Sequence, residues 1–335
     1  MMSSRGMFRS FSAEADGRSD VADRRSPMAE QLLYVHPSRV LEATPSPRLA
    51  ALLPADFEIF QYPGARRTVI LRSQLRDRLI AADVQNPESL KRGPLFSGWI
   101  EGGRTRHALI RVEGESWVLK EYRRGGLVGR WNSSRYWRCG RFFEELRVSD
   151  LAERSGISTA GALALIIERA GLGSVRAWLL TRFLPGVRPL HAFFGDPFES
   201  DLFRAAGGNV ASMHRAGIDH PDLHLGNIVG SVDSEGVHAH IVDWDRARLR
   251  VPGSWNPSSN LLRLWRSVEK GRRLGAFGTS ASRKERSLSF SSRPLRAFIR
   301  GYFDGDPGAL REARKYLRRR ARFFGMRTWF WRTPK

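Results

Sequence analysis

His220-Pro-Asp222-Leu-His224-Leu-Gly-Asn227 decides the expected fold of this chain, together with Asp243-Trp244-Asp245 at the end of a later apolar run. A kinase-type phosphoryl-transfer loop needs a carboxylate that accepts the proton of the substrate hydroxyl and, five residues later, an amide that binds Mg²⁺. A second carboxylate for the metal comes from a following strand. We therefore predict Asp222 as the catalytic base, and Asn227 and Asp243 as metal ligands.

The residues around this loop predict a β-hairpin and a preceding helix. Two short apolar runs, Ile228-Val229 and His240-Ile-Val242, flank a turn-rich segment that is typical of a hairpin. Such a hairpin would bring Asn227 and Asp243 together. Asp196-Pro197 is a helix-start signal upstream of the loop. A single Asp is a common turn residue, so the prediction depends on the spaced set and not on any one member.

An ATP-binding lobe should precede such a loop, and the sequence contains its two usual parts. Gly102 and Gly103 lie in a glycine-rich turn, where backbone N–H groups can approach the nucleotide phosphates closely. Lys120 ends the second of two predicted strands, 107–112 and 116–120, and its ammonium would meet those phosphates. The glycine spacing departs from that of protein kinases, and by itself it is equally typical of a plain hairpin.

Lys120 also needs an ion-pair partner on the next helix, which would hold its ammonium at the phosphates. Glu144 and Glu145 are the candidates, and both lie in an amphipathic segment that begins near Arg141. We favour Glu145 because it directly precedes the apolar Leu146. A solvated carboxylate on the helix surface is the alternative for either residue.

The chain has 335 residues, which is enough for one two-lobed domain. We predict an α+β, protein-kinase-like fold with an N-terminal ATP-binding lobe over residues 48–185 and a C-terminal catalytic lobe over 186–310. Within the first lobe, residues 161–170 and 175–183 are predicted strands. Residues 1–47 lack sustained apolar periodicity, which predicts a disordered or loosely attached segment.

The charge of the chain predicts an anionic partner. The formal net charge is +22, and the segment from Ser254 to Lys335 holds 21 Lys and Arg against 5 Asp and Glu. Nucleic acid and an anionic membrane surface both suit such a balance. The basic, aromatic segment 311–335 either binds such a membrane or packs on the C-terminal lobe. A single cysteine, Cys139, excludes an internal disulfide framework and argues against a Cys-rich zinc site.

Taken together, these motifs give the chain a family resemblance. It resembles the bacterial lipopolysaccharide-core kinases, most closely the kinases of 3-deoxy-D-manno-octulosonic acid (Kdo), over residues 98–267. The motifs that carry the resemblance are Lys120-Glu-Tyr-Arg-Arg-Gly-Gly-Leu127 with Tyr136-Trp137, Glu145-Leu-Arg147, Leu179-Leu-Thr-Arg-Phe-Leu-Pro-Gly186, Asp222-Leu-His-Leu-Gly-Asn227, Val242-Asp-Trp-Asp-Arg-Ala-Arg248 and Asn260-Leu-Leu-Arg-Leu-Trp-Arg-Ser267.

The resemblance implies an enzyme that uses ATP and Mg²⁺ to phosphorylate a sugar hydroxyl of the lipopolysaccharide inner core. The expected acceptor is the Kdo residue of a lipid A precursor, which is an anionic glycolipid. Arg123 and Arg124 would meet its carboxylates or phosphates. The expected location is the cytoplasmic face of the bacterial inner membrane, where the protein would bind peripherally. Neither a nucleic-acid partner nor a protein partner is expected.

The departures from protein kinases favour a small or glycolipid acceptor over a protein. Pro221 replaces the arginine before the catalytic Asp, Asp245 replaces the glycine of Asp-Phe-Gly, and no Ala-Pro-Glu segment follows. A heptose kinase and an aminoglycoside- or choline-type phosphotransferase remain alternatives, although acceptor sites of the latter type are typically acidic. A non-catalytic nucleic-acid or membrane-binding protein would explain the basic tail, but it would not explain the spaced metal ligands.

Overall fold

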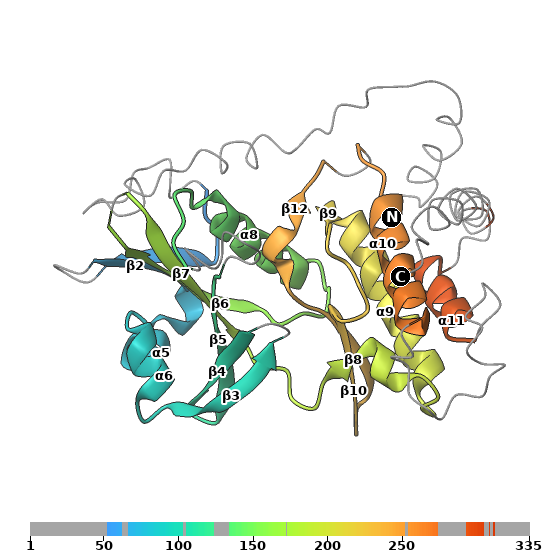
Figure 1. Ribbon diagram of the computed structural model, residues 1–335, viewed down its shortest axis with the longest axis horizontal. Coiled ribbons are helices and arrows are strands. Elements are labelled where there is room, and N and C mark those ends of the chain that lie inside the picture. The colour runs from blue at the N-terminus through green and yellow to red at the C-terminus, as the bar shows by residue number, and fades with distance from the viewer. Residues whose placement is uncertain are drawn as a thin grey trace, which may run out of the picture. The chain divides into compact units, whose positions relative to one another are not determined.

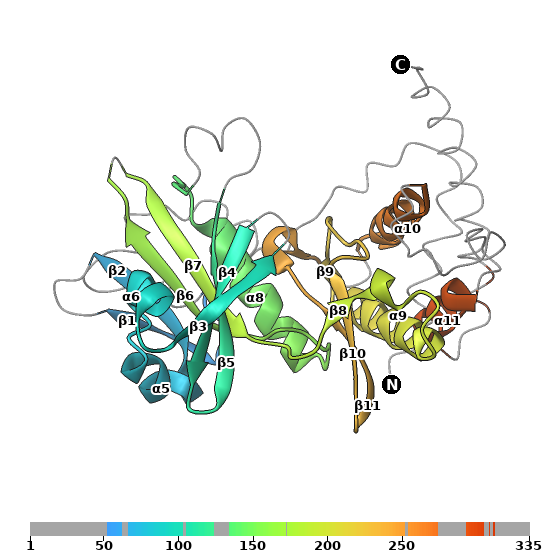
Figure 2. The same cartoon turned by 60° about the horizontal axis from the view of Figure 1, so that its bottom comes forward.

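The described part of the chain forms two compact units (Figures 1 and 2). The computed structural model describes residues 52–61, 66–102, 105–123, 134–171, 173–251, 254–273, 293–304, 308 and 311. The first unit extends to Gly186 and also contains Val242–Leu249, and the second contains Val187–Ile241 and the described residues from Arg250 onward. The predicted segments 1–47 and, Arg311 apart, 311–335 lie outside the described residues.

The first unit is built around a seven-stranded antiparallel sheet. Its strands are β1 (Phe57–Gln61), β2 (Arg67–Arg72), β3 (Phe96–Gly102), β4 (Thr105–Val112), β5 (Glu115–Glu121), β6 (Ala162–Arg169) and β7 (Val175–Arg182), in the spatial order β1-β2-β6-β7-β5-β4-β3. The remaining elements are η1 (Ser73–Leu75), α5 (Arg76–Ala81), α6 (Pro87–Arg92), α8 (Gly140–Arg154), η3 (Trp244–Arg246) and β12 (Arg248–Leu249). The four strands predicted between residues 107 and 183 are confirmed as β4 to β7.

Both faces of this sheet are buried, which explains the continuous apolar run of β6. Leu165 and Ile167 belong to one core cluster, which also contains Phe142, Phe143 and Leu146 of α8. Ile166 points to the other face, where Leu79 of α5 and Leu90 of α6 complete a second cluster. Successive strand residues point to opposite faces, so a strand that is covered on both sides needs apolar side chains throughout. The central strands therefore hold α8 in a fixed position on one face.

The second unit combines helices with a small sheet. Its elements are β8 (Arg188–Pro189), η2 (Leu190–Phe193), α9 (Glu199–Arg215), β9 (Ile218–Asp219), β10 (Ile228–Asp233), β11 (Gly236–Ile241), α10 (Ser258–Arg273) and α11 (Arg293–Tyr302). The predicted hairpin is confirmed: β10 pairs with β11 from Ile228 opposite Ile241 to Asp233 opposite Gly236. The α+β class predicted from the sequence is also confirmed.

Helix α9 begins slightly later than the sequence predicted. The Asp196-Pro197 signal suggested a start at Pro197, whereas the helix begins at Glu199. The Asp196 carboxylate accepts a hydrogen bond from the Phe198 N–H at 2.9 Å, which forms a turn typical of Asp. This turn competes with a first helical turn at Pro197 and moves the helix start by two residues.

Two glycines allow α9 and α11 to pack closely. A Cβ at Gly207 would overlap the carbonyl oxygen of Phe298, and a Cβ at Gly301 would overlap that of Arg204. Neither glycine has a positive φ. The reason for glycine at these positions is therefore the close approach of two backbones and not a turn conformation.

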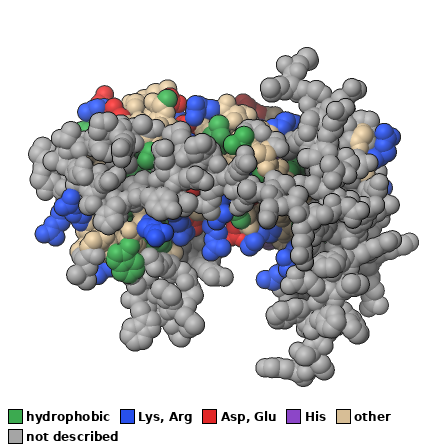
Figure 3. Space-filling model, turned by 90° about the horizontal axis from the view of Figure 1, so that it is seen from above, with side chains coloured by type: hydrophobic (Ala, Val, Ile, Leu, Met, Phe, Trp, Pro, Cys, Tyr) green, Lys and Arg blue, Asp and Glu red, His purple; other side chains and the backbone are tan. Residues whose placement is uncertain are grey.

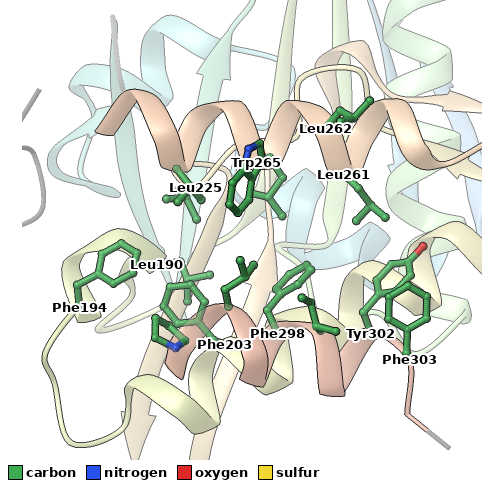
Figure 4. A pocket seen from close by; sticks show the side chains of 15 residues that line it. Leu190, Phe194, Phe203, Leu225, Leu261, Leu262, Trp265, Phe298, Tyr302 and Phe303 are labelled. Carbon is green, nitrogen blue, oxygen red and sulfur yellow. The ribbon is translucent and has the colours of Figure 1, made fainter. Parts of the chain in front are cut away.

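A small apolar cavity of about 70 Å³ lies among α9, α10 and α11 (Figure 4). Side chains that line it include Phe203 of α9, Leu261 and Trp265 of α10, and Phe298 and Phe303 at α11. Figure 4 shows Trp265 and Leu261 of α10 on one side and Phe298 on the other. Because these residues occupy the apolar face of α10, its polar residues remain available for the loop that contains Asp222.

Candidate active site

Strand β5 and helix α8 bring Lys120 and Glu145 together in the first unit. The Nζ atom of Lys120 lies 3.3 Å from Oε1 of Glu145 and 2.6 Å from Oδ1 of Asp243. The predicted pairing of Lys120 with Glu145 is therefore present. Glu144 is also buried in α8 but does not form this ion pair. Asp243, which the sequence suggested only as a metal ligand, is a second partner of the lysine.

The lysine in this cluster is held in its charged form. Burial opposes the charge on Lys120, but the carboxylates of Glu145, Asp243 and Asp245 outweigh it and raise the pKa of the ammonium. Burial raises the pKa of Glu145, as do Asp245 and Asp243, while Lys120 and a 2.6 Å hydrogen bond donated by the Tyr122 hydroxyl oppose that shift. The site therefore presents a permanent ammonium, surrounded by carboxylates, at the end of β5.

The segment after β11 is fixed by its own unusual backbone and by two side-chain anchors. Asp243 has a left-handed conformation with φ 65°, which costs a residue with a Cβ on the order of 1 kcal/mol. Trp244 is buried, and its Nε1–H donates to Oγ1 of Thr159 at 2.9 Å. Asp245 forms a two-pronged ion pair with Arg141 of α8. Asp245 occupies the position of the glycine in the Asp-Phe-Gly motif of protein kinases. Its ion pair with Arg141 holds this segment against α8.

The loop that contains Asp222 belongs to the second unit and is closed by its own hydrogen bonds. The Asn227 side chain donates through Nδ2 to the carbonyl oxygen of Asp222 at 3.0 Å. The Gly226 N–H donates to Nδ1 of His224, also at 3.0 Å. These bonds fix the position of the predicted metal ligand, Asn227, relative to the predicted base, Asp222.

Helix α10 holds this loop with three polar side chains on one face. Asn260, Arg263 and Ser267 are spaced i, i+3 and i+7, so they lie along one side of the helix. Their bonds are Asn260 Oδ1 with the His220 N–H at 2.8 Å, Arg263 Nη2 with Asp222 Oδ1 at 2.9 Å, and Ser267 Oγ with the Leu225 N–H at 3.1 Å. From the sequence, this helix was expected only as part of a family motif and without a role of its own. The polar spacing within 260–267 is the signal that could have identified it.

A buried ion pair supports the start of the loop. Arg250 donates to Oδ2 of Asp219 at 2.9 Å, and the Asn260 side chain donates to Oδ1 of the same carboxylate at 2.9 Å. The side chains of Arg250 and Asp219 are 5% and 10% exposed. Loss of either partner would leave a buried charge without compensation, which is strongly destabilising. The pair therefore anchors the chain three residues before Asp222.

The residues predicted to hold Mg²⁺ have suitable chemistry. Magnesium prefers oxygen ligands and is usually held by one or two carboxylates together with substrate phosphates. Asn227 uses its amide nitrogen for the Asp222 carbonyl, which leaves its Oδ1 as the acceptor atom. The Asp243 side chain is 46% exposed. No group of three or more His, Cys, Asp and Glu side chains within the described ranges could hold a metal ion on its own.

Of the other residues predicted to contact nucleotide or acceptor, only some lie in the described part of the chain. Gly102 ends β3, whereas Gly103 and Arg124 lie outside the described residues. Arg123 forms an ion pair with Glu121 at 3.0 Å, and Arg176 contacts the same carboxylate at 3.0 Å. Arg123 is thus part of a charge cluster at the end of β5.

The described surface is rich in basic side chains. On the face that Figure 3 presents, the areas of Lys and Arg are more extensive than those of Asp and Glu, in keeping with the formal charge of +22. None of the helices in the described ranges has the length and apolar character needed to span a bilayer.

The chain is similar to known kinases over most of the region that contains these residues. Residues 96–302 match the lipopolysaccharide kinase (Kdo/WaaP) family. A 3-deoxy-D-manno-octulosonic acid kinase of Xanthomonas oryzae pv. oryzae is 36% identical over 213 residues, which are 58% of this chain and 78% of that protein. A protein of the same name from Vibrio cholerae serotype O1 is 31% identical over 173 residues, which are 50% of this chain and 72% of that protein.

Two solved structures are also similar. One is WaaP in complex with acyl carrier protein, with 19% identity, a TM-score of 0.48, and coverage of 79% of this chain and 96% of that one. The other is the amicoumacin kinase hAmiN in complex with AMP-PNP, Ca²⁺ and Ami, with 13% identity, a TM-score of 0.45, and coverage of 68% of this chain and 79% of that one. WaaP has a protein partner in its structure, and the expectation that this chain has none is not confirmed.

Proposed function

The chain belongs to the lipopolysaccharide kinase (Kdo/WaaP) family, and from this premise we propose that it transfers the γ-phosphate of ATP to a hydroxyl of the Kdo residue of a lipid A precursor. The family match over residues 96–302 carries the proposal, because it includes Lys120, Glu145, Asp222, Asn227 and Asp243. The relatives from Vibrio cholerae and Xanthomonas oryzae are both named as kinases of this sugar acid.

Asp222 is the base in the proposed reaction. Its carboxylate accepts the proton of the sugar hydroxyl as the hydroxyl oxygen forms a bond to the γ-phosphorus, while the bond from that phosphorus to the bridging oxygen breaks and ADP leaves. One carboxylate oxygen, Oδ1, accepts a hydrogen bond from Arg263. The other oxygen is the one we assign to the acceptor hydroxyl. Arg263 therefore sets the orientation of the base without taking part in proton transfer.

Lys120 is the phosphate-binding residue in this proposal. Its raised pKa keeps the ammonium charged, and the Glu145 carboxylate holds it at the end of β5. Asn227 and Asp243 would hold Mg²⁺, which in phosphoryl transfer neutralises charge that develops on the phosphate oxygens. Asp243 also accepts a hydrogen bond from Lys120 through Oδ1, which places this predicted metal ligand beside the lysine that would bind the phosphates.

The proposed place of action is a membrane surface, because the acceptor is a glycolipid. The basic and aromatic segment 311–335 supports this, since Lys and Arg near an anionic surface each contribute about 1 kcal/mol of attraction. We expect the protein to co-sediment with anionic vesicles at low salt and to be released as salt rises. Binding to neutral and anionic vesicles alike would contradict an electrostatic attachment.

The test of the function is phosphate transfer by the purified chain. Wild type, Asp222→Asn and Asp243→Asn are incubated with ATP, Mg²⁺ and a Kdo-bearing lipid A precursor. The mass of the glycolipid is then measured by mass spectrometry. We expect one added phosphate with wild type and a loss of at least 100-fold in rate with Asp222→Asn. Transfer to a heptose-bearing acceptor but not to this one would move the assignment to another sugar of the same inner core.

A further inference from the structure

A groove of about 920 Å³, lined in part by charged and polar side chains, opens beside Asp222 in the second unit. Its lining includes His191, Asp222 and His224, together with Arg263, Arg266 and Lys270 of α10. The apolar cavity of Figure 4 also borders α10 and shares Leu225 and Leu262 with this groove, but no charged side chain lines it. The acceptor hydroxyl must reach Asp222, so this groove is the space in the second unit into which the acceptor sugar can enter.

The basic residues of the groove form a row along α10. Arg263, Arg266 and Lys270 are all exposed, and their spacing of three and four residues places them along one side of the helix. With a rise of 1.5 Å per residue, the row extends over about 10 Å, which is comparable to the length of one or two sugar rings. The row begins at Arg263, which donates a hydrogen bond to the predicted base, Asp222.

The charges that line the groove do not balance. Its two carboxylates, Asp219 and Asp222, already form ion pairs with Arg250 and Arg263. With Arg266 and Lys270, the lining holds three Lys and Arg side chains against these two carboxylates. The wall beside the predicted base therefore carries a positive excess, which favours an anionic acceptor and disfavours a cationic one.

We propose that Arg266 and Lys270 bind the carboxylate of the acceptor sugar and so select a sugar acid as the substrate. This inference deepens the proposed function and rests on it. A sugar acid carries its carboxylate and its hydroxyls on one sugar unit, so a hydroxyl at Asp222 keeps the carboxylate close enough to lie in the same groove. Phosphates of the lipid anchor lie on other sugar rings and have no such obligatory distance. A guanidinium also matches a carboxylate in a two-pronged geometry, which adds selectivity to attraction.

The matched variants are Arg266→Gln combined with Lys270→Gln, and Arg296→Gln as a control. Arg296 is an exposed arginine of α11 in the same unit and does not line the groove. The double variant should raise the KM for the Kdo-bearing acceptor at least tenfold and leave the KM for ATP within twofold. The control should match wild type. Both should keep the wild-type thermal unfolding midpoint, because the three side chains are exposed.

A second experiment changes the acceptor instead of the protein. The methyl ester of the Kdo carboxylate should have a KM at least tenfold higher than the free acid with wild type, and the double variant should no longer distinguish the two. A double variant that discriminates as strongly as wild type would overturn the proposal, because another group would then recognise the carboxylate. If the KM values for ester and acid are equal, and the KM rises only when the lipid phosphates are removed, the protein recognises the phosphates and not the carboxylate. This result would also overturn the proposal.

Binding without ATP separates this inference from the proposed function. The dissociation constant of the Kdo-bearing glycolipid is measured by calorimetry for wild type, the double variant and the control. If wild type transfers no phosphate but binds the glycolipid, and the double variant binds it at least tenfold more weakly, the proposed function fails and the carboxylate site stands. If wild type does not bind it, or the double variant binds it equally well, the carboxylate site is refuted.

Discussion

Removing the Arg263 guanidinium should reduce catalysis far more than stability. The ion pair between Arg263 and Asp222 has one bond of 2.9 Å, and the two side chains are 51% and 34% exposed. Pairs this exposed contribute only about 0 to 1 kcal/mol to the free energy of unfolding. A base that loses its orientation by about 1 Å can lose on the order of 100-fold in rate. Arg263→Ala should therefore lower kcat by about 10- to 100-fold and the free energy of unfolding by less than about 1 kcal/mol.

The assay combines steady-state kinetics, with ATP and acceptor varied separately, and urea denaturation of the same preparations. Arg263→Lys should recover part of the lost kcat, because it keeps a donor to Asp222 but loses the planar geometry of the guanidinium. Arg296→Ala should leave both readouts unchanged. A fall in kcat of less than threefold would refute the positioning role. A loss of more than about 3 kcal/mol of stability, with kcat falling only in proportion to the unfolded fraction, would show a structural role instead.

Three further perturbations follow from the structure. Lys120→Met should lower kcat by at least about 100-fold, because it removes the ammonium that we propose binds the phosphates and leaves the buried Glu145 without its cation. Burial lowers the pKa of His214 to about 3, so the folded state holds a neutral ring while the unfolded state binds a proton below pH 6.5. Stability should thus fall as pH drops below 6.5, by about 2 kcal/mol at pH 5, and His214→Phe should reduce this slope. Gly207→Ala should cost about 1 to 3 kcal/mol by separating α9 from α11, whereas Gly208→Ala on the same helix should not destabilise it.

For each of these three predictions, one result would contradict it. Wild-type kcat in Lys120→Met would remove this lysine from phosphate binding. An unfolding free energy that stays constant between pH 7 and pH 5, with and without His214, would show that the ring is protonated in the folded state. Equal effects of alanine at positions 207 and 208 would refute close packing as the reason for Gly207.

The fold was predictable where local pattern and chemistry agree. The apolar runs of β4 to β7 and the β10–β11 hairpin were visible in the sequence, because apolar runs bounded by turn residues are local signals. The pairing of Lys120 with Glu145 was predicted from the need to hold the ammonium, and the structure contains it. The start of α9 was predicted two residues early, because the turn at Asp196 uses the same residue type as a helix cap.

The contacts that hold Asp222 and Asp245 in place depend on tertiary structure and could not be predicted. Nothing in the sequence near Asp222 indicates that Arg263 pairs with it 41 residues later, since that contact requires the path of α10 to be known. The same holds for Arg141 and Asp245, which are 104 residues apart. The grouping of Val242–Leu249 with the sheet of the first unit, and not with the hairpin that precedes it, is likewise a result of packing.

Transfer of phosphate between two competing acceptors tests the central claim most directly. Purified protein is given ATP and Mg²⁺ with equal amounts of a lipid A precursor with and without its Kdo residue, and the products are resolved by mass spectrometry. The account predicts one added phosphate on the Kdo-bearing glycolipid alone, and at least 100-fold less product with Asp222→Asn. Phosphate on both glycolipids, or an Asp222→Asn variant as active as wild type, would contradict it.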